Sequence, residues 1–241
     1  MSIIVLSPNV SVESAKSLAE ALKAKYENPY ETRNRDFTKY DVVVKYGFSR
    51  PIKTKKGALV VNKTKSVEIA IDKIKTLSLF KEDGFTVPFA ITKAEAKKFL
   101  DKKGSVVARL DATASNGIGI VYCDTEEELK KVTEAKFYTK YIKSTNEFRV
   151  NVWRDKVVSV YDKVVPNEHF RFKLFQGVEE HPQLVAMAKA IYEKTGLDFY
   201  GLDVLRDRKG TLHLLEINSS PVLFPYTLNK LTTIIKKEAG K

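Results

Sequence analysis

The feature that most constrains the fold is a pair of apolar segments, FYGLDVLR at 199–206 and TLHLLEIN at 211–218, which flank the turn-forming residues DRKG. Two such segments joined by a short turn ending in glycine predict an antiparallel β-hairpin. Because several other strand-like segments are also joined by short turns, the sequence favours an α+β fold over a doubly wound parallel sheet.

This hairpin carries polar residues where a core strand should be apolar. If Arg206 pairs with Thr211, then Asp203, Glu216 and Asn218 project from one face, because side chains alternate along a strand. Two carboxylates and an amide oxygen suit a hard cation such as Mg²⁺. Taken alone, such a pair more often caps backbone or binds a surface lysine, and a one-residue slip would turn Asp203 away.

The first part of the chain, residues 1–64, predicts a small α/β lobe. Strands are expected at 3–6, 40–46 and 58–62, and a helix from Ser11 in which apolar residues recur at helical spacing. This β-α-β-β unit is too small to be the whole fold.

The remainder alternates helical and strand-like segments. Two matches to a capping box, at Thr92–Glu95 and Thr125–Glu128, mark helix starts, and Gly196 fits the end of a helix that begins at Pro182. Helices are predicted at 65–80, 92–100, 125–132, 182–195 and near the C-terminus, and strands at 105–110, 119–123, 136–142, 147–153 and 156–165.

Composition narrows the class of protein less than the motifs do. Lys and Arg number 42 against 30 Asp and Glu, a formal net charge of +12, which favours an anionic partner but fits a lysine-rich solvated surface equally well. Cys123 is the single cysteine, and no apolar run reaches membrane-spanning length. With no signal-peptide pattern at the start, we expect a cytoplasmic protein without a membrane partner.

The motifs together resemble the ATP-grasp enzymes over roughly residues 62–224. The segments LDFYGLDVL and LLEINSSP are similar to the family's hairpin, in which an Asp and a Glu-x-Asn hold Mg²⁺ on the ATP phosphates. The resemblance implies an ATP-grasp fold, with two α+β lobes gripping ATP, at 65–138 and 139–241, after the N-terminal lobe at 1–64. It implies two Mg²⁺ ions, with Mn²⁺ as a substitute, held by Asp203, Glu216 and Asn218.

Further matches imply the ATP site. IDKIKTL places Lys73 on a phosphate, VVARLDATASNGIGI places Arg109 and a small-residue loop there, and YTKYIKSTNEF resembles the hinge that reads adenine and ribose. Each has a plainer explanation, such as a solvated lysine, a tight turn or core packing. The implied nucleotide-binding residues are Lys73, Arg109, Ser115, Asn116, Gly117, Lys140, Tyr141, Ile142 and Glu147.

Three cations are implied at the reacting end of the site. Arg149 shares a face with Glu147, Lys163 lies two strands on, and Arg171 is in a polar stretch. D-alanine–D-alanine ligases carry an Arg two residues before the metal Asp, and here that position is Gly201. Either Arg171 or Lys163 is expected to supply the missing charge, or the intermediate is stabilised differently.

The resemblance implies an ATP-dependent carboxylate–amine (or thiol) ligase that works through an acyl phosphate and releases ADP. The compact chain resembles bacteriophage-type members, and its basic surface suits an acidic peptide or a nucleic-acid-linked group as acceptor. An ATP-grasp kinase, an ATP-binding sensor or assembly protein, and a nucleic-acid-binding module remain alternatives. The substrates and the oligomeric state do not follow from the sequence.

Overall fold

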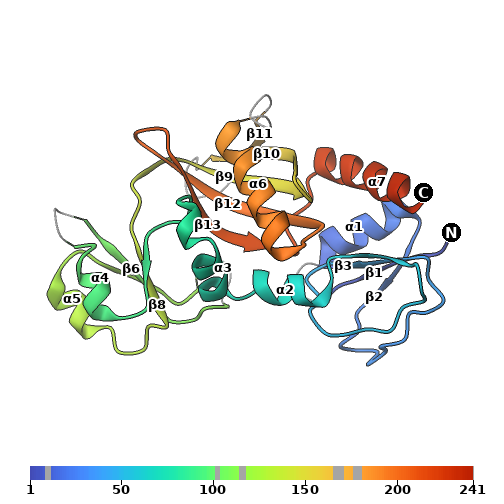
Figure 1. Cartoon of the computed structure of the whole chain (residues 1–241), viewed down its shortest axis with the longest axis horizontal. Helices are drawn as coiled ribbons and strands as arrows, with labels where there is room; N and C mark the ends of the chain where they lie inside the picture. The colour runs from blue at the N-terminus through green and yellow to red at the C-terminus, as the bar shows by residue number, and fades with distance from the viewer. Residues whose placement is uncertain (9–11, 101–103, 114–117, 165–170, 176–180, 241) are drawn as a thin grey trace.

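The computed structural model describes residues 1–8, 12–100, 104–113, 118–164, 171–175 and 181–240. Within these described residues the strands form three sheets, each from a different stretch of the chain. The N-terminal sheet and the second sheet lie at opposite ends, and the third sheet lies between them (Figure 1). The mixed α and β content with three sheets agrees with the predicted α+β class.

The N-terminal sheet is entirely parallel, in the order β2-β1-β3-β4. Its central strands, β1 and β3, are apolar except for Lys45 at the end of β3, because both faces are buried, as is usual in parallel sheets. The strand β2 was not predicted, since KYE is short and polar. The elements are β1 (Ile3–Leu6), α1 (Val12–Leu22), β2 (Lys25–Glu27), β3 (Val42–Lys45) and β4 (Leu59–Val61).

The second sheet is antiparallel, in the order β5-β8-β6-β7, and two short helices cover one of its faces. Both predicted capping boxes are confirmed: Thr92 accepts from the backbone of Glu95, and Thr125 from that of Glu128. The elements are β5 (Phe89–Ala90), α4 (Lys93–Lys97), β6 (Val106–Arg109), β7 (Ile120–Cys123), α5 (Glu126–Lys131) and β8 (Phe137–Lys140).

The third sheet is antiparallel and has the order β11-β10-β9-β12-β13. Helix α6 packs on one face, and it begins at Pro182 and ends at a left-handed Gly196 (φ 64°), as predicted. The opposite face carries the polar residues of the hairpin. The elements are β9 (Ser144–Trp153), β10 (Lys156–Val164), β11 (Arg171–Leu174), α6 (Pro182–Thr195), β12 (Phe199–Asp207) and β13 (Leu212–Asn218).

The single helix predicted over 65–80 is wrong, because the chain forms two helices there. Helix α2 (Thr64–Ala70) ends before Asp72, and α3 (Lys73–Leu79) starts after it; a short 3-10 turn, η2 (Lys81–Asp83), follows. The Asp72 side chain accepts a hydrogen bond from the backbone N–H of Lys75 at 3.0 Å and so caps α3. The break places Lys73 in the first turn of a helix that packs on β13.

The C-terminal helix α7 (Pro225–Ala239) returns to the N-terminal lobe and packs on α1. Their apolar faces form one core, the shared core, which also takes in Trp153, Val158 and Phe199 from the third sheet. Among the residues described, none of the helices has the length and apolar character required to cross a membrane.

Candidate active site

The β12–β13 hairpin forms with a different register from the one predicted. Arg206 pairs with Leu212 rather than Thr211, and a β-bulge at Leu215 adds a second shift, so that Asp203 lies directly opposite Glu216. In the shifted register without the bulge, Asp203 would face Leu215 and Glu216 would point into the core. The shifted pairing and the bulge offset each other, so Asp203, Glu216 and Asn218 lie on one face of the sheet as predicted.

Asp203, Glu216 and Asn218 therefore lie together on the face of the third sheet away from α6. Asp203 is 7% exposed and forms a bidentate ion pair with Arg149, with Nε–Oδ1 at 2.9 Å and Nη2–Oδ2 at 3.0 Å. The Asn218 amide donates to Oε1 of Glu216 at 3.1 Å. Arg149 occupies this position because β9 pairs it with Asp203.

Burial and charge act in opposite directions on the two carboxyls. Burial raises the pKa of Asp203, assisted by the charge of nearby Glu216 and opposed by Arg149. Burial alone would also raise the pKa of Glu216, but the charge of Lys73 and the hydrogen bond from Asn218 bring it below its usual value. Both carboxyl groups are largely shielded from water, and a buried carboxylate is stabilised by a bound cation.

Two further cations reach this face from the second sheet and α3. Nζ of Lys73 lies 3.3 Å from Oε2 of Glu216. Arg109 is at the end of β6, and its Nε is buried with no hydrogen-bond partner in the part of the chain that the structure describes. Burial lowers the pKa of Arg109, and the negative charge of Glu216 counteracts that shift. A buried guanidinium with an unmet donor is suited to an anionic group.

Glu147 and Lys163 pair with each other at the open side of the sheet. Nζ of Lys163 donates to both carboxylate oxygens of Glu147 at 2.8 Å. Arg171 begins β11, where its backbone lies opposite Val164. Phe172, next along β11, lies opposite Lys163 and has the Arg149 guanidinium 5.2 Å from its ring centre.

The predicted adenine segment lies where β8 ends. The backbone N–H of Lys140 donates to Pro88, and that of Tyr141 to Ser105, so these two donors already have protein acceptors. Ile142 is partly buried in the cluster described next. The predicted phosphate-binding residues Ser115, Asn116 and Gly117 lie outside the described residues.

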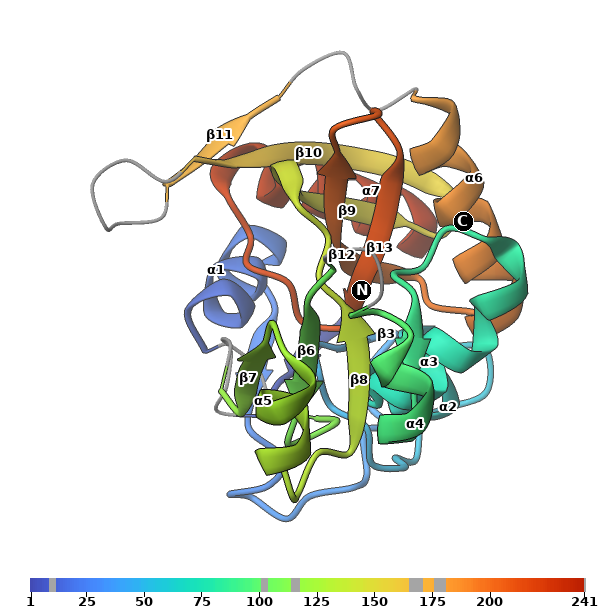
Figure 2. The ribbon, with the colours of Figure 1, turned by 90° about the vertical axis from the view of Figure 1, so that its left-hand side faces the viewer.

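An apolar cluster, here the inter-sheet cluster, joins the second and third sheets beside the candidate metal face. Figure 2 shows the ribbons of these two sheets, with β6 and β8 below the β12–β13 hairpin. Leu205 and Leu215 face the same side as Asp203 and Glu216, and both are partly buried. Sequence reasoning missed them as site residues, although Leu215 directly precedes Glu216. The members are Ile74, Leu77, Val87, Phe89, Ala112, Phe137, Ile142, Leu205 and Leu215.

Gly201, the position where some ligases carry an arginine, is closed to any side chain. A Cβ atom there would lie 2.6 Å from Cβ of Pro221. The loop after β13 packs against the strand at this point, so the glycine is a steric requirement of this chain.

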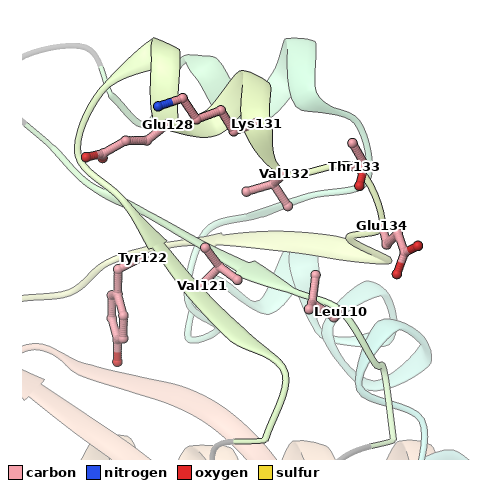
Figure 3. Close-up of a pocket in the computed structure, with 8 residues that line it drawn as sticks. All are labelled: Leu110, Val121, Tyr122, Glu128, Lys131, Val132, Thr133 and Glu134. Carbon is pink, nitrogen blue, oxygen red and sulfur yellow. The ribbon is translucent and has the colours of Figure 1, made fainter.

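A separate pocket lies beside α5 on the other side of the second sheet (Figure 3). Val121 pairs with Ala108, so it faces the helices while neighbouring Arg109 faces the third sheet. None of the predicted site residues lines this pocket, which is the open margin of the helix-covered core. Its lining is Leu110, Val121, Tyr122, Glu128, Lys131, Val132, Thr133 and Glu134.

Comparison with known proteins identifies the class. A family model described as the RimK-like ATP-grasp domain matches residues 51–237, so the chain belongs to the RimK-like ATP-grasp family. It is 31% identical over 191 residues to a probable alpha-L-glutamate ligase of Pseudoalteromonas translucida, and 31% identical over 185 residues to a probable alpha-L-glutamate ligase 1 of Shewanella sp. strain MR-4. These matches cover 69% and 68% of this chain, but they span only 61% and 60% of those relatives.

Solved structures share the fold at low sequence identity. The ATP-grasp ligase PsnB in complex with a minimal precursor superposes with a TM-score of 0.73 at 13% identity, over 100% of this chain and 99% of that one. D-alanyl-alanine synthetase A from Vibrio cholerae gives 0.71 at 14% identity, with the same coverage of each chain. The expected ATP-grasp fold is thereby confirmed.

Proposed function

We propose that this protein is an ATP- and Mg²⁺-dependent ligase that joins a carboxylate to an amine and releases ADP and phosphate. The observation that carries the proposal is the convergence of Asp203, Glu216 and Asn218 with the cations Lys73 and Arg109 on one poorly solvated face. The naming of the matched relatives as probable alpha-L-glutamate ligases supports the same reaction class.

The residues present fit Mg²⁺ and a nucleotide triphosphate. Asp203, Glu216 and Asn218 offer the oxygen ligands that Mg²⁺ prefers. The unmet Nε of Arg109 and the ammonium of Lys73 are suited to phosphate oxygens. The partly buried Leu205 and Leu215 offer an apolar surface for the base.

The nucleotide would change the partners of each charged group. Lys73 and Arg149 now pair with the two candidate metal carboxylates, and Lys163 pairs with Glu147. With Mg²⁺ and ATP bound, Lys73, Arg149 and Lys163 would bind phosphate oxygens in place of these carboxylates. Glu147 would then accept hydrogen bonds from the ribose hydroxyls, since a carboxylate accepts from two donors at once.

The chemistry needs positioning and charge neutralisation more than a protein nucleophile. A substrate carboxylate oxygen attacks the γ-phosphorus while the bond to ADP breaks, giving an acyl phosphate. The amine then attacks the acyl carbon, phosphate leaves, and the amine loses a proton. Bound Mg²⁺ would neutralise charge on the phosphates, and Lys163, Arg149 and Arg171 are the cations proposed to stabilise the transferred group.

We propose glutamate as the first substrate to test, because the matched relatives are named for it. Purified protein would be given ATP, Mg²⁺, glutamate and acidic peptides, and ADP release would be measured with product masses. The Glu216→Gln variant should stay folded, as checked by circular dichroism, and lose ADP release by at least about 100-fold because a metal ligand is gone.

The product decides between the remaining alternatives. A new amide bond with ADP supports the ligase, whereas a phosphoester would make the protein a kinase. Tight ATP binding without turnover on any substrate would favour a sensor. Equal ADP release by wild type and Glu216→Gln would contradict the proposed site.

A further inference from the structure

A group of cations and aromatic rings lies at the carboxyl edge of the N-terminal sheet, outside the site described above. Lys45 is the last residue of β3, and the loop that follows it carries Phe48 and Arg50. Ligands of parallel sheets bind at this edge, where the strands end. We call Tyr30, Arg35, Lys45, Phe48 and Arg50 the cation–aromatic cluster.

The members of this cluster are held together by ring contacts. Tyr30 meets Phe48 edge to face, with ring centres 5.3 Å apart. The Arg50 guanidinium lies 4.6 Å from the Tyr30 ring centre, and Arg35 and Lys45 lie 5.3 and 5.5 Å from that of Phe48. Aromatic faces thus hold three positive charges close to one another.

Within the described parts of the chain, no ion pair joins Arg35, Lys45 or Arg50 to a carboxylate. Lys45 is 1% exposed and lies in the field of Glu68, so Arg50, which is exposed, and Arg35, which is partly buried, are the cations that a ligand can reach. Arg35 donates to the carbonyls of Pro29 and Asn34, and Lys45 donates to the Arg50 carbonyl. Residues 28–57 contain eight Lys and Arg but three Asp and Glu, a net charge of +5. Such a concentration of charge lowers its own repulsion by binding anions.

The cluster is next to the candidate metal face. The N–H of Gly47 donates to the carbonyl of Ser219 at 3.2 Å, and the Tyr46 hydroxyl donates to the carbonyl of Pro221. Ser219 directly follows Asn218, so the loop between Lys45 and Arg50 lies against the end of the metal hairpin. A chain bound at the cluster is therefore within reach of the reacting groups.

We propose that the cation–aromatic cluster docks an acidic peptide, binding carboxylates adjacent to the one that reacts. This inference rests on the proposed ligase function and adds a substrate-docking surface in the N-terminal lobe. Guanidinium groups bind carboxylates in matched geometry, and Arg50 is exposed on the surface. A nucleic acid is the weaker fit, because Phe48 is fully buried and the cations already cover the ring faces on which bases would stack.

The test is binding of a fluorescein-labelled oligo-glutamate peptide to the full chain, measured by fluorescence anisotropy with and without Mg²⁺ and ATP. Arg50→Glu should weaken binding by about tenfold or more. The matched control is Lys237→Glu, an equal charge reversal at an exposed position on α7, which should change binding by less than about twofold. Arg50→Gln removes the charge alone, and thermal melting of each variant reports whether it is folded.

Equal weakening by Arg50→Glu and Lys237→Glu would overturn the docking surface and leave only general charge attraction. Absence of oligo-glutamate binding, or tighter Arg50-dependent binding of a single-stranded oligonucleotide, would also overturn it. ADP release separates this inference from the proposed function. If ADP release occurs and is the same in wild type and Arg50→Glu, the ligase function is supported and the docking surface is rejected. If the peptide binds in an Arg50-dependent way but no ADP is released, the docking surface is supported and the ligase function is rejected.

Discussion

Arg149 and Asp203 form a largely buried bidentate charge pair at the site, with side chains 22% and 10% exposed. Arg149→Ala would leave the Asp203 carboxylate buried without its counter-charge, which should lower the free energy of unfolding by about 3–5 kcal/mol. Urea denaturation measures this. The double variant Arg149→Met with Asp203→Leu removes both charges and should recover most of the loss. If the double variant is no more stable than the single one, the ion pair is not the cause.

Lys45 gives a prediction about pH. Burial lowers the pKa of its ammonium to about 8, below the usual lysine value of about 10.4. Between these pH values the unfolded chain binds more protons than the folded one, so the contribution of Lys45 to stability rises with pH. Relative to Lys45→Met, the wild type should therefore gain unfolding free energy from pH 8 to pH 10 in chemical denaturation. Parallel curves for the two proteins would contradict the lowered pKa.

Among the secondary-structure elements, the hairpin shows what sequence patterns can and cannot give. Its two strands and its polar face follow from alternation, but the register does not. The bulge at Leu215 leaves no mark in an apolar run, because Leu214 and Leu215 are both compatible with burial. Asp72, the residue that caps α3, is the sequence signal for the break between α2 and α3. The regular apolar spacing on both sides of Asp72 nevertheless predicts one long helix. The register of a strand and the point at which a helix breaks depend on packing between segments that are distant in the sequence.

The extra residue Leu215 should be dispensable for the metal face. Deleting Leu215 would remove the bulge and leave Asp203 opposite Glu216, because Val204 pairs with Leu214 directly before the shift. We expect Mg²⁺-dependent ATP binding, measured by calorimetry, to persist but to weaken, because a partly buried side chain of the inter-sheet cluster is lost. Leu215→Ala shortens the same side chain and keeps the bulge, so it should weaken binding to a similar extent. Loss of Mg²⁺-dependent binding in the deletion variant alone would show that the bulge itself shapes the metal face.

In the whole molecule, a shared core joins the N-terminal and third sheets, which are together called the first body here, and the second sheet is the second body. Helices α1 and α7 and residue Phe199 contribute to this core, and Asn62 accepts from the backbone N–H groups of Asp198 and Phe199 at 2.9 Å each. The second sheet has its own core and meets the third through the inter-sheet cluster. The candidate ATP-site residues are divided between these two bodies, with the nucleotide-binding candidate Arg109 on the second and the metal-binding candidate Glu216 on the first.

Nucleotide binding should therefore restrain the second sheet more than the rest of the molecule. With Mg²⁺ and ATP present, amide hydrogen exchange should slow in β6, in β8 and at 140–142, because phosphates and base would bridge the two bodies. Exchange in β1 and β3, buried in the N-terminal lobe, should stay as it is. Mass spectrometry of exchanged peptides measures both regions in one experiment, and Glu216→Gln with the same nucleotide is the control. Protection that is uniform across the three sheets, or that persists in Glu216→Gln, would mean that the nucleotide is not held between Arg109 and the metal hairpin.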